Sequence, residues 1–264
     1  MYATKDLGAR DSSVGPLLDR QRDAHGGGPY YTSSVKACIV IPAYDAEATI
    51  GAVIDAVREA MPDLPLYVVD DGSRDGTATI AKDRRCTVLA HERNRGKGAA
   101  LRTAFAAARD DGHDVALTID ADGQHPAGEA RRVLEASNDA EALVLGVRAL
   151  ERDGAPKKNV FSNGISNYFL SRFAGRPLRD TQCGLRRYPL ARTLDLAARA
   201  HGTGYELEAE LLLRAVWAGV PIVEVPVTVL YPEDRTTHFR ISRDPWRIID
   251  VIVRARLEHA RGRA

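Results

Sequence analysis

Three polar residues at alternate positions carry the clearest chemical signal in this sequence: Asp120, Asp122 and Gln124, which follow a short apolar run. Alternate side chains of an extended backbone point to the same side, so the oxygens of these three residues can converge. Hard cations such as Mg²⁺ and Mn²⁺ prefer oxygen ligands. The spacing therefore predicts a divalent metal site that can bridge a diphosphate, and the alternative is a solvated acidic turn.

A second acidic pair and a glycine-rich turn indicate a related ligand. Asp70 and Asp71 close another apolar run, where a carboxylate can accept hydrogen bonds from a base or a ribose. Either residue could instead cap a helix that begins near Asp75. Residues 95–98, Arg-Gly-Lys-Gly, precede a predicted helix, so their backbone and Lys97 could approach an anion. This turn lacks the spacing of a P-loop, which counts against a kinase, and it could also start the helix without any ligand.

The elements that must position these residues alternate between strands and helices. From Lys36 onward, short apolar runs alternate with amphipathic stretches, which predicts an α/β fold with an open, mostly parallel sheet and helices on both faces. Ligands of such sheets bind beyond the carboxyl ends of the strands, where both acidic clusters fall. We expect strands at 37–42, 66–69, 87–90, 115–119, 143–147 and 221–230, and helices at 46–60, 98–109, 159–173, 206–217 and 246–259.

Composition limits the classes of protein that fit. The 264 residues suffice for one enzyme-sized domain, and the 37 basic and 36 acidic residues nearly cancel, so we expect no nucleic-acid partner. Three distant cysteines support neither a disulfide framework nor a zinc site. No stretch approaches the roughly 18 to 20 apolar residues that cross a bilayer. We therefore expect a cytoplasmic protein, with peripheral contact at the inner face of the membrane left open.

Three segments are expected along the chain. Residues 1–34 have no periodic apolar face and are interpreted as a mobile leader, and residues 35–240 form the catalytic domain. Residues 241–264 form a C-terminal amphipathic helix. Its apolar residues, among them Trp246, Ile249 and Val253, alternate with arginines, so it could rest on an anionic membrane or pack on the core.

The sequence resembles family 2 glycosyltransferases, because four motifs occur in the order seen in that family. They are residues 41–44 (Ile-Pro-Ala-Tyr), 69–77 (Val-Asp-Asp-Gly-Ser-Arg-Asp-Gly-Thr), 94–98 (Asn-Arg-Gly-Lys-Gly) and 120–126 (Asp-Ala-Asp-Gly-Gln-His-Pro). The likeness is to the branch of dolichyl-phosphate mannose synthases and polyprenyl-phosphate glucosyltransferases, and residues 180–184 (Asp-Thr-Gln-Cys-Gly) resemble that branch too. The resemblance spans roughly residues 36–240 and implies a GT-A-like, Rossmann-related fold.

This resemblance implies a metal-dependent inverting transferase that moves a hexose from a GDP- or UDP-sugar to a polyprenyl phosphate of the dolichyl type. It places Asp120, Ala121 and Asp122 at the diphosphate and sugar, with Mg²⁺ or Mn²⁺ held mainly by Asp122 and Gln124, and Asp120 as a further ligand. It implies that the donor nucleotide sugar is also surrounded by Pro42, Ala43, Tyr44, Glu47, Val69, Asp70, Asp71 and Lys97. Glu47 departs from the pattern, because it stands three residues beyond Tyr44 where many polyprenyl-phosphate enzymes have it two beyond.

The acceptor side follows from the same resemblance. Arg148 matches an arginine that contacts the donor or the acceptor phosphate, and a cluster beginning at Arg235 resembles a basic loop that folds over the substrates. A lipid phosphate is already ionised and needs positive groups to place it. A hydroxyl acceptor needs a carboxylate as base, for which Glu206 and its neighbour Glu208 are candidates. Both could instead favour the start of a helix through its dipole.

Two other classes of protein stay open at this point. A sugar nucleotidyltransferase would use similar metal chemistry, but it should carry a glycine-rich arginine-lysine signature after the first strand, which residues 42–45 lack. A non-catalytic nucleotide-binding module is the other, because a fold alone does not dictate function.

Overall fold

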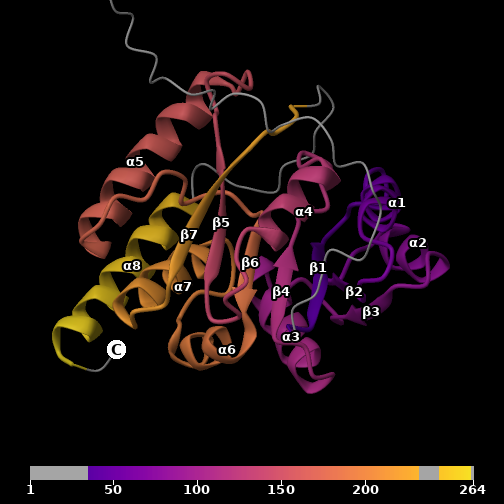
Figure 1. Cartoon of the computed structure of the whole chain (residues 1–264), viewed down its shortest axis with the longest axis horizontal. Coiled ribbons are helices and arrows are strands. Elements are labelled where there is room, and N and C mark those ends of the chain that lie inside the picture. Colours follow the sequence, from indigo (N-terminus) through magenta and orange to yellow (C-terminus); the bar gives the residue numbers. More distant parts are fainter. Residues whose placement is uncertain (1–34, 232–243, 263–264) are drawn as a thin grey trace, which may run out of the picture. The chain divides into compact units, whose positions relative to one another are not determined.

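The computed structural model describes residues 35–231 and 244–262, and these form a sheet of seven strands with helices around it (Figure 1). The strand order is β3-β2-β1-β4-β6-β5-β7. The strands are β1 (Ala37–Ala43), β2 (Leu66–Asp70), β3 (Thr87–Ala90), β4 (Val115–Thr118), β5 (Leu143–Arg148), β6 (Arg186–Pro189) and β7 (Ile222–Val227). All neighbouring strands pair in parallel except at β6, which runs antiparallel to both β4 and β5.

The central strand β1 shows why this sheet needs helices on both of its faces. Every residue of its sequence ACIVIPA is buried. Cys38 and Val40 belong to the core beneath α3, α6 and α7, whereas Ile39 and Ile41 alternate with them and are equally buried. Because alternate side chains of a strand point to opposite faces, both faces of β1 are covered.

The helices form two groups of neighbours. α1 contacts α2 and α4, while α3, α6 and α7 contact one another and α5 and α8 pack on α7. Their bounds are α1 (Ile50–Ala60), α2 (Thr77–Asp83), α3 (Lys97–Asp110), α4 (Ala127–Glu135), α5 (Lys157–Ala174), α6 (Leu190–Arg199), α7 (Glu206–Trp217) and α8 (Asp244–Ala260). Among the residues described, no helix is long and apolar enough to cross a membrane.

Two consecutive buried arginines on β6 fasten the loops around the sheet. Arg186 donates to the carbonyl oxygens of Cys183 at 2.7 Å, Thr181 at 2.8 Å and Glu208 at 2.8 Å. Arg187 points to the other face and donates to the carbonyl of Leu134 at 3.1 Å, at the end of α4. Helix ends leave carbonyls without partners, so a buried guanidinium with several donors can satisfy them where water cannot.

The predicted fold class is confirmed, with three additions that the sequence did not indicate. Helices α4 and α6 and the antiparallel strand β6 were not expected. α4 buries only Ala130, Val133 and Leu134, which is too thin an apolar face to identify a helix from its period. The predicted leader and the cluster beginning at Arg235 lie outside the described residues.

Candidate active site

The carboxyl ends of β1, β2, β4 and β5 lie at one edge of the sheet, because these strands run in the same direction. Asp70 is the last residue of β2 and pairs in register with Ala43 of β1. Pro42 and Val69 form the preceding pair, and all four residues are buried. The predicted nucleotide-binding residues of the two strands are therefore brought side by side at this edge.

The loops that follow β1 and β2 are bound to each other by hydrogen bonds in both directions. The N–H of Asp45 donates to Ser73 Oγ at 2.9 Å, and the N–H of Arg74 donates back to Asp45 Oδ1 at 2.8 Å. Glu47 accepts from the N–H of Gly76 at 2.7 Å, at the start of α2. This contact gives Glu47 a structural function, and its predicted role at the nucleotide stays a proposal.

Asp71 fixes the glycine-rich turn that precedes α3. Its carboxylate accepts hydrogen bonds from the N–H groups of Arg95 at 2.9 Å and Gly96 at 2.7 Å, and it lies 2.6 Å from His91 Nδ1. Gly96 has φ 95°, and a Cβ there would lie 2.6 Å from the carbonyl oxygen of Thr203. Only glycine fits this turn without strain, so Asp71 and Gly96 together set where Lys97 begins the helix.

Lys97 bridges two carboxylates from different parts of the chain. Its Nζ lies 2.7 Å from Asp120 Oδ1 and 2.7 Å from Glu208 Oε2. Burial alone would lower the pKa of Lys97, but the charges of Asp120 and Glu208 outweigh it and raise the pKa. For Asp120, burial acts to raise the pKa, but the charge of Lys97 dominates and lowers it. Lys97 is therefore a permanent cation and Asp120 a permanent anion at this edge of the sheet.

Asp122 is the carboxylate of this cluster whose charge is least compensated. Burial and the nearby charge of Asp120 raise its pKa to about 6. Its Oδ1 accepts a hydrogen bond from the N–H of Gln124 at 3.0 Å, so the two residues form one turn. The carbonyl of Gln124 in turn accepts from the N–H of Leu230 at 2.8 Å, which ties this turn to the segment after β7.

The chemistry of these donors fits a divalent cation. No group of three or more His, Cys, Asp or Glu side chains with the arrangement of a metal site occurs among the described residues. A hard cation here would take oxygens from Asp122 and Gln124 and further oxygens from a bound diphosphate. Asp120, also predicted as a ligand, is held by Lys97. A Cβ on residue 184 would lie 2.3 Å from Oδ2 of Asp120, so glycine is required at position 184.

Arg148, at the end of β5, forms a bidentate ion pair with Asp180. Its Nε lies 2.7 Å from Asp180 Oδ2 and its Nη2 lies 3.0 Å from Oδ1. Asn163 of α5 donates to the same carboxylate at 2.8 Å. Burial tends to raise the pKa of Asp180, but Arg148 more than offsets it and lowers the pKa. The segment that follows Asp180 reaches the acidic turn, because Gly184 lies against Asp120 and its carbonyl accepts from Thr118 Oγ1 at 2.8 Å, so this pair belongs to the same site.

The two neighbouring glutamates at the start of α7 have different surroundings. Glu206 Oε1 accepts from the N–H groups of Thr203 at 3.1 Å and Gly204 at 3.0 Å, and from Arg247 of α8 at 2.8 Å. Burial opposes the effect, but these backbone hydrogen bonds keep the pKa of Glu206 below its usual value. Glu208 has one oxygen on Lys97, and its buried Oε1 has no hydrogen-bond partner among the described residues.

Three residues of this site went unassigned in the sequence prediction. His91 holds Asp71, Asn163 holds Asp180, and His125 is buried beside the acidic turn with its pKa lowered to about 4 by burial. His125 stood in a recognised motif, but nothing in the sequence connected His91 or Asn163 to their partners. The cluster beginning at Arg235, predicted to cover the substrates, falls outside the described residues.

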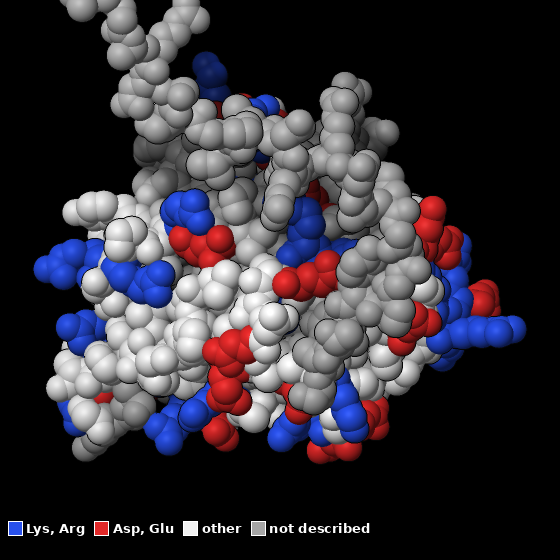
Figure 2. All heavy atoms as spheres, viewed as in Figure 1, with Lys and Arg blue, Asp and Glu red and all other residues white. Residues whose placement is uncertain are grey.

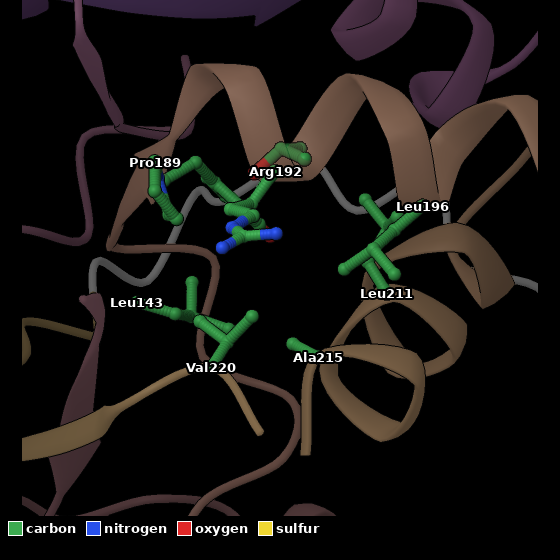
Figure 3. A pocket seen from close by; sticks show the side chains of 9 residues that line it. Leu143, Pro189, Arg192, Leu196, Leu211, Ala215 and Val220 are labelled. Atoms are coloured by element: carbon green, nitrogen blue, oxygen red, sulfur yellow. The ribbon is translucent and has the colours of Figure 1, made fainter. Parts of the chain in front are cut away.

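A small hollow lies away from this chemistry (Figure 3). It is lined mainly by apolar residues, among them Leu143, Leu196 and Val220, with Arg192 beside them. Leu143 begins β5, so the hollow lies at the amino end of the parallel strands. None of the predicted site residues lines it, and ligands of open α/β sheets bind at the opposite edge.

Comparisons with known proteins agree with this geometry. The polyprenol monophosphomannose synthase of Mycolicibacterium smegmatis is 29% identical over 243 residues, which cover 86% of this chain and 91% of that protein. The undecaprenyl-phosphate mannosyltransferase of Micrococcus luteus is 29% identical over 209 residues, which cover 75% of this chain and 85% of that protein. The glucosyl-3-phosphoglycerate synthase of Mycobacterium tuberculosis, solved with Mn²⁺, UDP-glucose and phosphoglyceric acid, shares the fold. Its TM-score is 0.68 at 21% identity, covering 84% of this chain and 80% of that one.

The family model for glycosyl transferase family 2 matches residues 38–188, which include the interlocked loops, the Lys97–Asp120 ion pair, the acidic turn and the Arg148–Asp180 pair. The fold is that of the GT-A glycosyltransferases. Because the match extends over more than half of the chain, this protein belongs to glycosyl transferase family 2 and is a transferase.

Proposed function

We propose that this transferase moves a hexose from a nucleoside diphosphate sugar, GDP- or UDP-linked, to the phosphate of a polyprenyl lipid, with Mg²⁺ or Mn²⁺ as cofactor. The observation that carries the proposal is that the segment from Asp180, which holds Arg148, to Gly184, which lies against Asp120, joins the Arg148–Asp180 pair to the acidic turn. One site then holds an acidic cluster for a metal-bound diphosphate and a fixed cation for a second anion. Relatives whose names specify polyprenol or undecaprenyl phosphate acceptors support the same choice.

The donor side would hold the nucleotide between the loops after β1 and β2. Pro42, Ala43, Tyr44, Val69 and Asp70 line the ends of these strands, in the position where α/β folds bind nucleotides. Glu47 and Asp71, which fasten the neighbouring loops, and Ala121 in the acidic turn complete the proposed set. Because the two loops are bound to each other, this side is preorganised before the donor arrives.

The acidic turn would hold the leaving diphosphate. A bound divalent ion stabilises the negative charge that develops on a leaving diphosphate. Asp122 and Gln124 would hold that ion, while Lys97 keeps Asp120 in place and supplies further positive potential. Attack by the acceptor on the face of the sugar opposite the diphosphate inverts the anomeric carbon in a single step.

The acceptor side would use fixed positive charge in place of a base. A lipid phosphate is ionised near neutral pH, so it needs an arginine to place it and no carboxylate to take a proton. Asp180 holds Arg148 in one orientation through a bidentate pair, which is the preorganisation that such placement requires. Arg235 would add a second positive group from the segment outside the described residues.

A hydroxyl acceptor is the second candidate, and one observation favours it. Glu208 has a buried oxygen without a hydrogen-bond partner among the described residues, and it sits on Lys97 next to Asp120. A carboxylate in that place could take a proton from a hydroxyl. The contacts of Glu206 with Arg247 and two backbone N–H groups favour Glu208 over Glu206 for that role.

Purified protein given labelled GDP-mannose, UDP-glucose or UDP-N-acetylglucosamine, with Mn²⁺ and a short-chain polyprenyl phosphate in detergent, tests the proposal. Labelled lipid phosphate should form, EDTA should stop the reaction, and Arg148→Ala should lower it at least about tenfold, because a charged hydrogen-bonding partner is lost. Arg152→Ala is the matched control, since Arg152 is 71% exposed at its side chain. Labelling of hydroxyl acceptors alone, abolished by Glu208→Gln, would replace the lipid phosphate with a hydroxyl.

A further inference from the structure

Helix α5 has an unusually polar inward side and an apolar outward side. Its last turns pack Leu170 and Phe173 on the core, but the rest of the inward side carries Asn163, Ser166, Asn167 and Ser171, all of which hydrogen-bond to the segment 178–182. Asn167, for example, donates to the carbonyl of Arg179 at 2.6 Å. A surface helix normally places its polar residues in water and its apolar residues inward.

The side of α5 that faces away from the protein is apolar and aromatic. Phe161 is 71% exposed and Tyr168 is 68% exposed, with Ile165 and Phe169 also exposed. These positions follow the spacing i, i+4, i+7 and i+8, which places them on one face of the helix. The rings of Tyr168 and Phe169 meet edge to face at 5.4 Å, so they form one continuous apolar surface. Exposed clusters of large apolar residues are characteristic of interaction surfaces.

The charge around this face has a single sign. Residues 154–179 contain five basic residues and no acidic one. Lys157 and Lys158 are exposed at the start of α5, and Arg172 and Arg176 are exposed at its end. Figure 2 shows mostly basic and uncharged atoms along the left margin, where Figure 1 places α5 and α8. Aromatic residues flanked by basic ones match an anionic lipid surface, where rings enter the interface and cations meet the head groups.

The inward side of α5 connects this face to the candidate active site. Asn163 donates to Asp180, and Asp180 holds Arg148. An acceptor entering beside Arg148 therefore meets the site next to the helix that carries the apolar face. This continuity matters for a polyprenyl phosphate, whose chain is in a bilayer while its phosphate must reach the protein.

Helix α8 offers a weaker surface for the same purpose. It packs on α7 through Ile248 and Ile252 and exposes Ile249, Val253 and Leu257. The exposed residues Ile249, Val253 and Leu257 are all aliphatic, and the three arginines of the helix are balanced by three acidic residues, Asp244, Asp250 and Glu258. Acidic side chains repel an anionic surface, so α8 serves as the internal comparison for α5.

We propose that the face of α5 formed by Phe161, Ile165, Tyr168 and Phe169 docks the protein onto a bilayer that contains anionic lipids. The inference rests on the proposed function, because a membrane is where a polyprenyl phosphate is found. Docking would bring Arg148 to the level of the lipid phosphates. The docking face would then increase the rate at which the acceptor is used, without taking part in the chemistry.

Vesicle flotation of the full chain tests the proposal with vesicles that contain no polyprenyl phosphate. One set is phosphatidylcholine alone and the other contains phosphatidylglycerol as well. Wild-type protein should float with the anionic vesicles and bind the neutral ones at least about tenfold more weakly. The variant Phe161→Ser/Tyr168→Ser/Phe169→Ser should lose at least about tenfold in binding to the anionic vesicles. The matched variant Ile249→Ser/Val253→Ser/Leu257→Ser should lose less than about threefold.

Two further measurements keep the result decisive. Lys157→Glu/Lys158→Glu leaves the apolar face intact and should remove the preference for anionic vesicles, so it replaces the triple variant if that one does not fold. Both α5 variants should keep wild-type transfer to a short-chain acceptor in detergent.

The docking surface is overturned if the wild-type protein does not bind vesicles, or if the α5 variants bind them as well as the wild type does. A wild-type dimer that the α5 change separates into monomers, without vesicle binding, means that a second copy covers the face. Failure of transfer in detergent, with vesicle binding intact, overturns the proposed function instead.

Discussion

The donor and acceptor sides of this site meet at the same edge of the sheet but are held in different ways. The loops after β1 and β2 are joined to each other and to the start of α3 through Asp45, Glu47 and Asp71. Arg148 on the acceptor side is held by Asp180, which in turn depends on α5, a helix with an apolar face in solvent. The proposed donor side is thus held by contacts within the protein, whereas the proposed acceptor side adjoins a helix whose outer face is exposed and apolar.

This difference separates two sources of energy for binding. A donor can bind a preorganised pocket whose loops are already ordered, so little conformational entropy is lost. An acceptor that is dilute in water but concentrated in a bilayer gains from bringing the protein to the surface. Changes on the donor side should therefore affect chemistry and stability, and changes on the acceptor side should affect mainly the use of acceptor.

The largest effect should come from Asp122→Asn, which removes the charge that would hold the metal ion. Transfer should fall at least about 10³-fold, because the stabilisation that a metal gives a developing charge is several kcal/mol. The fold should persist, since the change opens no core cavity. Turnover and circular dichroism check both parts, with the exposed Asp63→Asn as the control. Near-normal activity in Mn²⁺ would show that Asp122 is not a ligand.

Lys97→Met should have the next largest effect, on stability. It leaves Asp120 and Glu208 as two buried carboxylates without their cation, and breaking a buried ion pair costs about 3–5 kcal/mol. Adding Glu208→Gln removes one of the stranded charges and should restore part of that loss. Denaturant unfolding of the two single variants and the double variant measures the coupling. Strictly additive effects would mean that Lys97 and Glu208 do not interact in solution.

The meeting of the two acidic clusters at one edge of the sheet could be predicted from the sequence, whereas the contacts around Lys97 and α5 could not. The location of acidic residues that follow apolar strands can be predicted directly, because a parallel sheet places the carboxyl ends of its strands at one edge. The link between Lys97 and Glu208 was not visible, because they lie far apart in the chain and no local pattern joins them. The polar inward side of α5 was hidden for another reason: its asparagines and serines hydrogen-bond to the backbone and side chains of segment 178–182, and no sequence period reports that requirement.

A smaller effect should separate the two glutamates at the start of α7. Glu206→Gln weakens the charge-assisted bonds to Thr203, Gly204 and Arg247, so it should lower the unfolding free energy by about 1 kcal/mol and leave kcat nearly unchanged. Glu208→Gln should almost keep stability, because Lys97 stays paired with Asp120. With a polyprenyl phosphate as acceptor its kcat should also stay nearly unchanged, whereas with a hydroxyl acceptor its kcat should fall. Turnover and thermal melting compare the two variants. A larger loss of kcat in Glu206→Gln would restore Glu206 as the base.

The smallest effect should be a shift in melting temperature that depends on metal and on pH. At about five times its dissociation constant, a nucleoside diphosphate with Mn²⁺ should stabilise the protein by about 1 kcal/mol, or about 2–4 °C for a chain of this size. EDTA should remove the shift, because the acidic turn repels a diphosphate that has no cation. An equal shift in melting temperature in EDTA would mean that Lys97 and backbone N–H groups bind the diphosphate without a metal ion.

The pH dependence of that shift follows from Asp122. Its pKa is raised to about 6, so in the metal-free protein the folded state holds a proton that the unfolded state has lost, and stability from this group falls as pH rises from about 4 to about 6. A metal ion must displace the same proton, so stabilisation by Mn²⁺ and nucleotide should grow as pH rises through about 6 and then level off. Asp122→Asn has no such proton and should show a shift that is small and independent of pH between about 5 and 7. Thermal melts of both proteins across this range compare the curves directly. Parallel curves would mean that the metal is held by ligands other than Asp122, although Asp122 is the carboxylate of this cluster whose charge is least compensated.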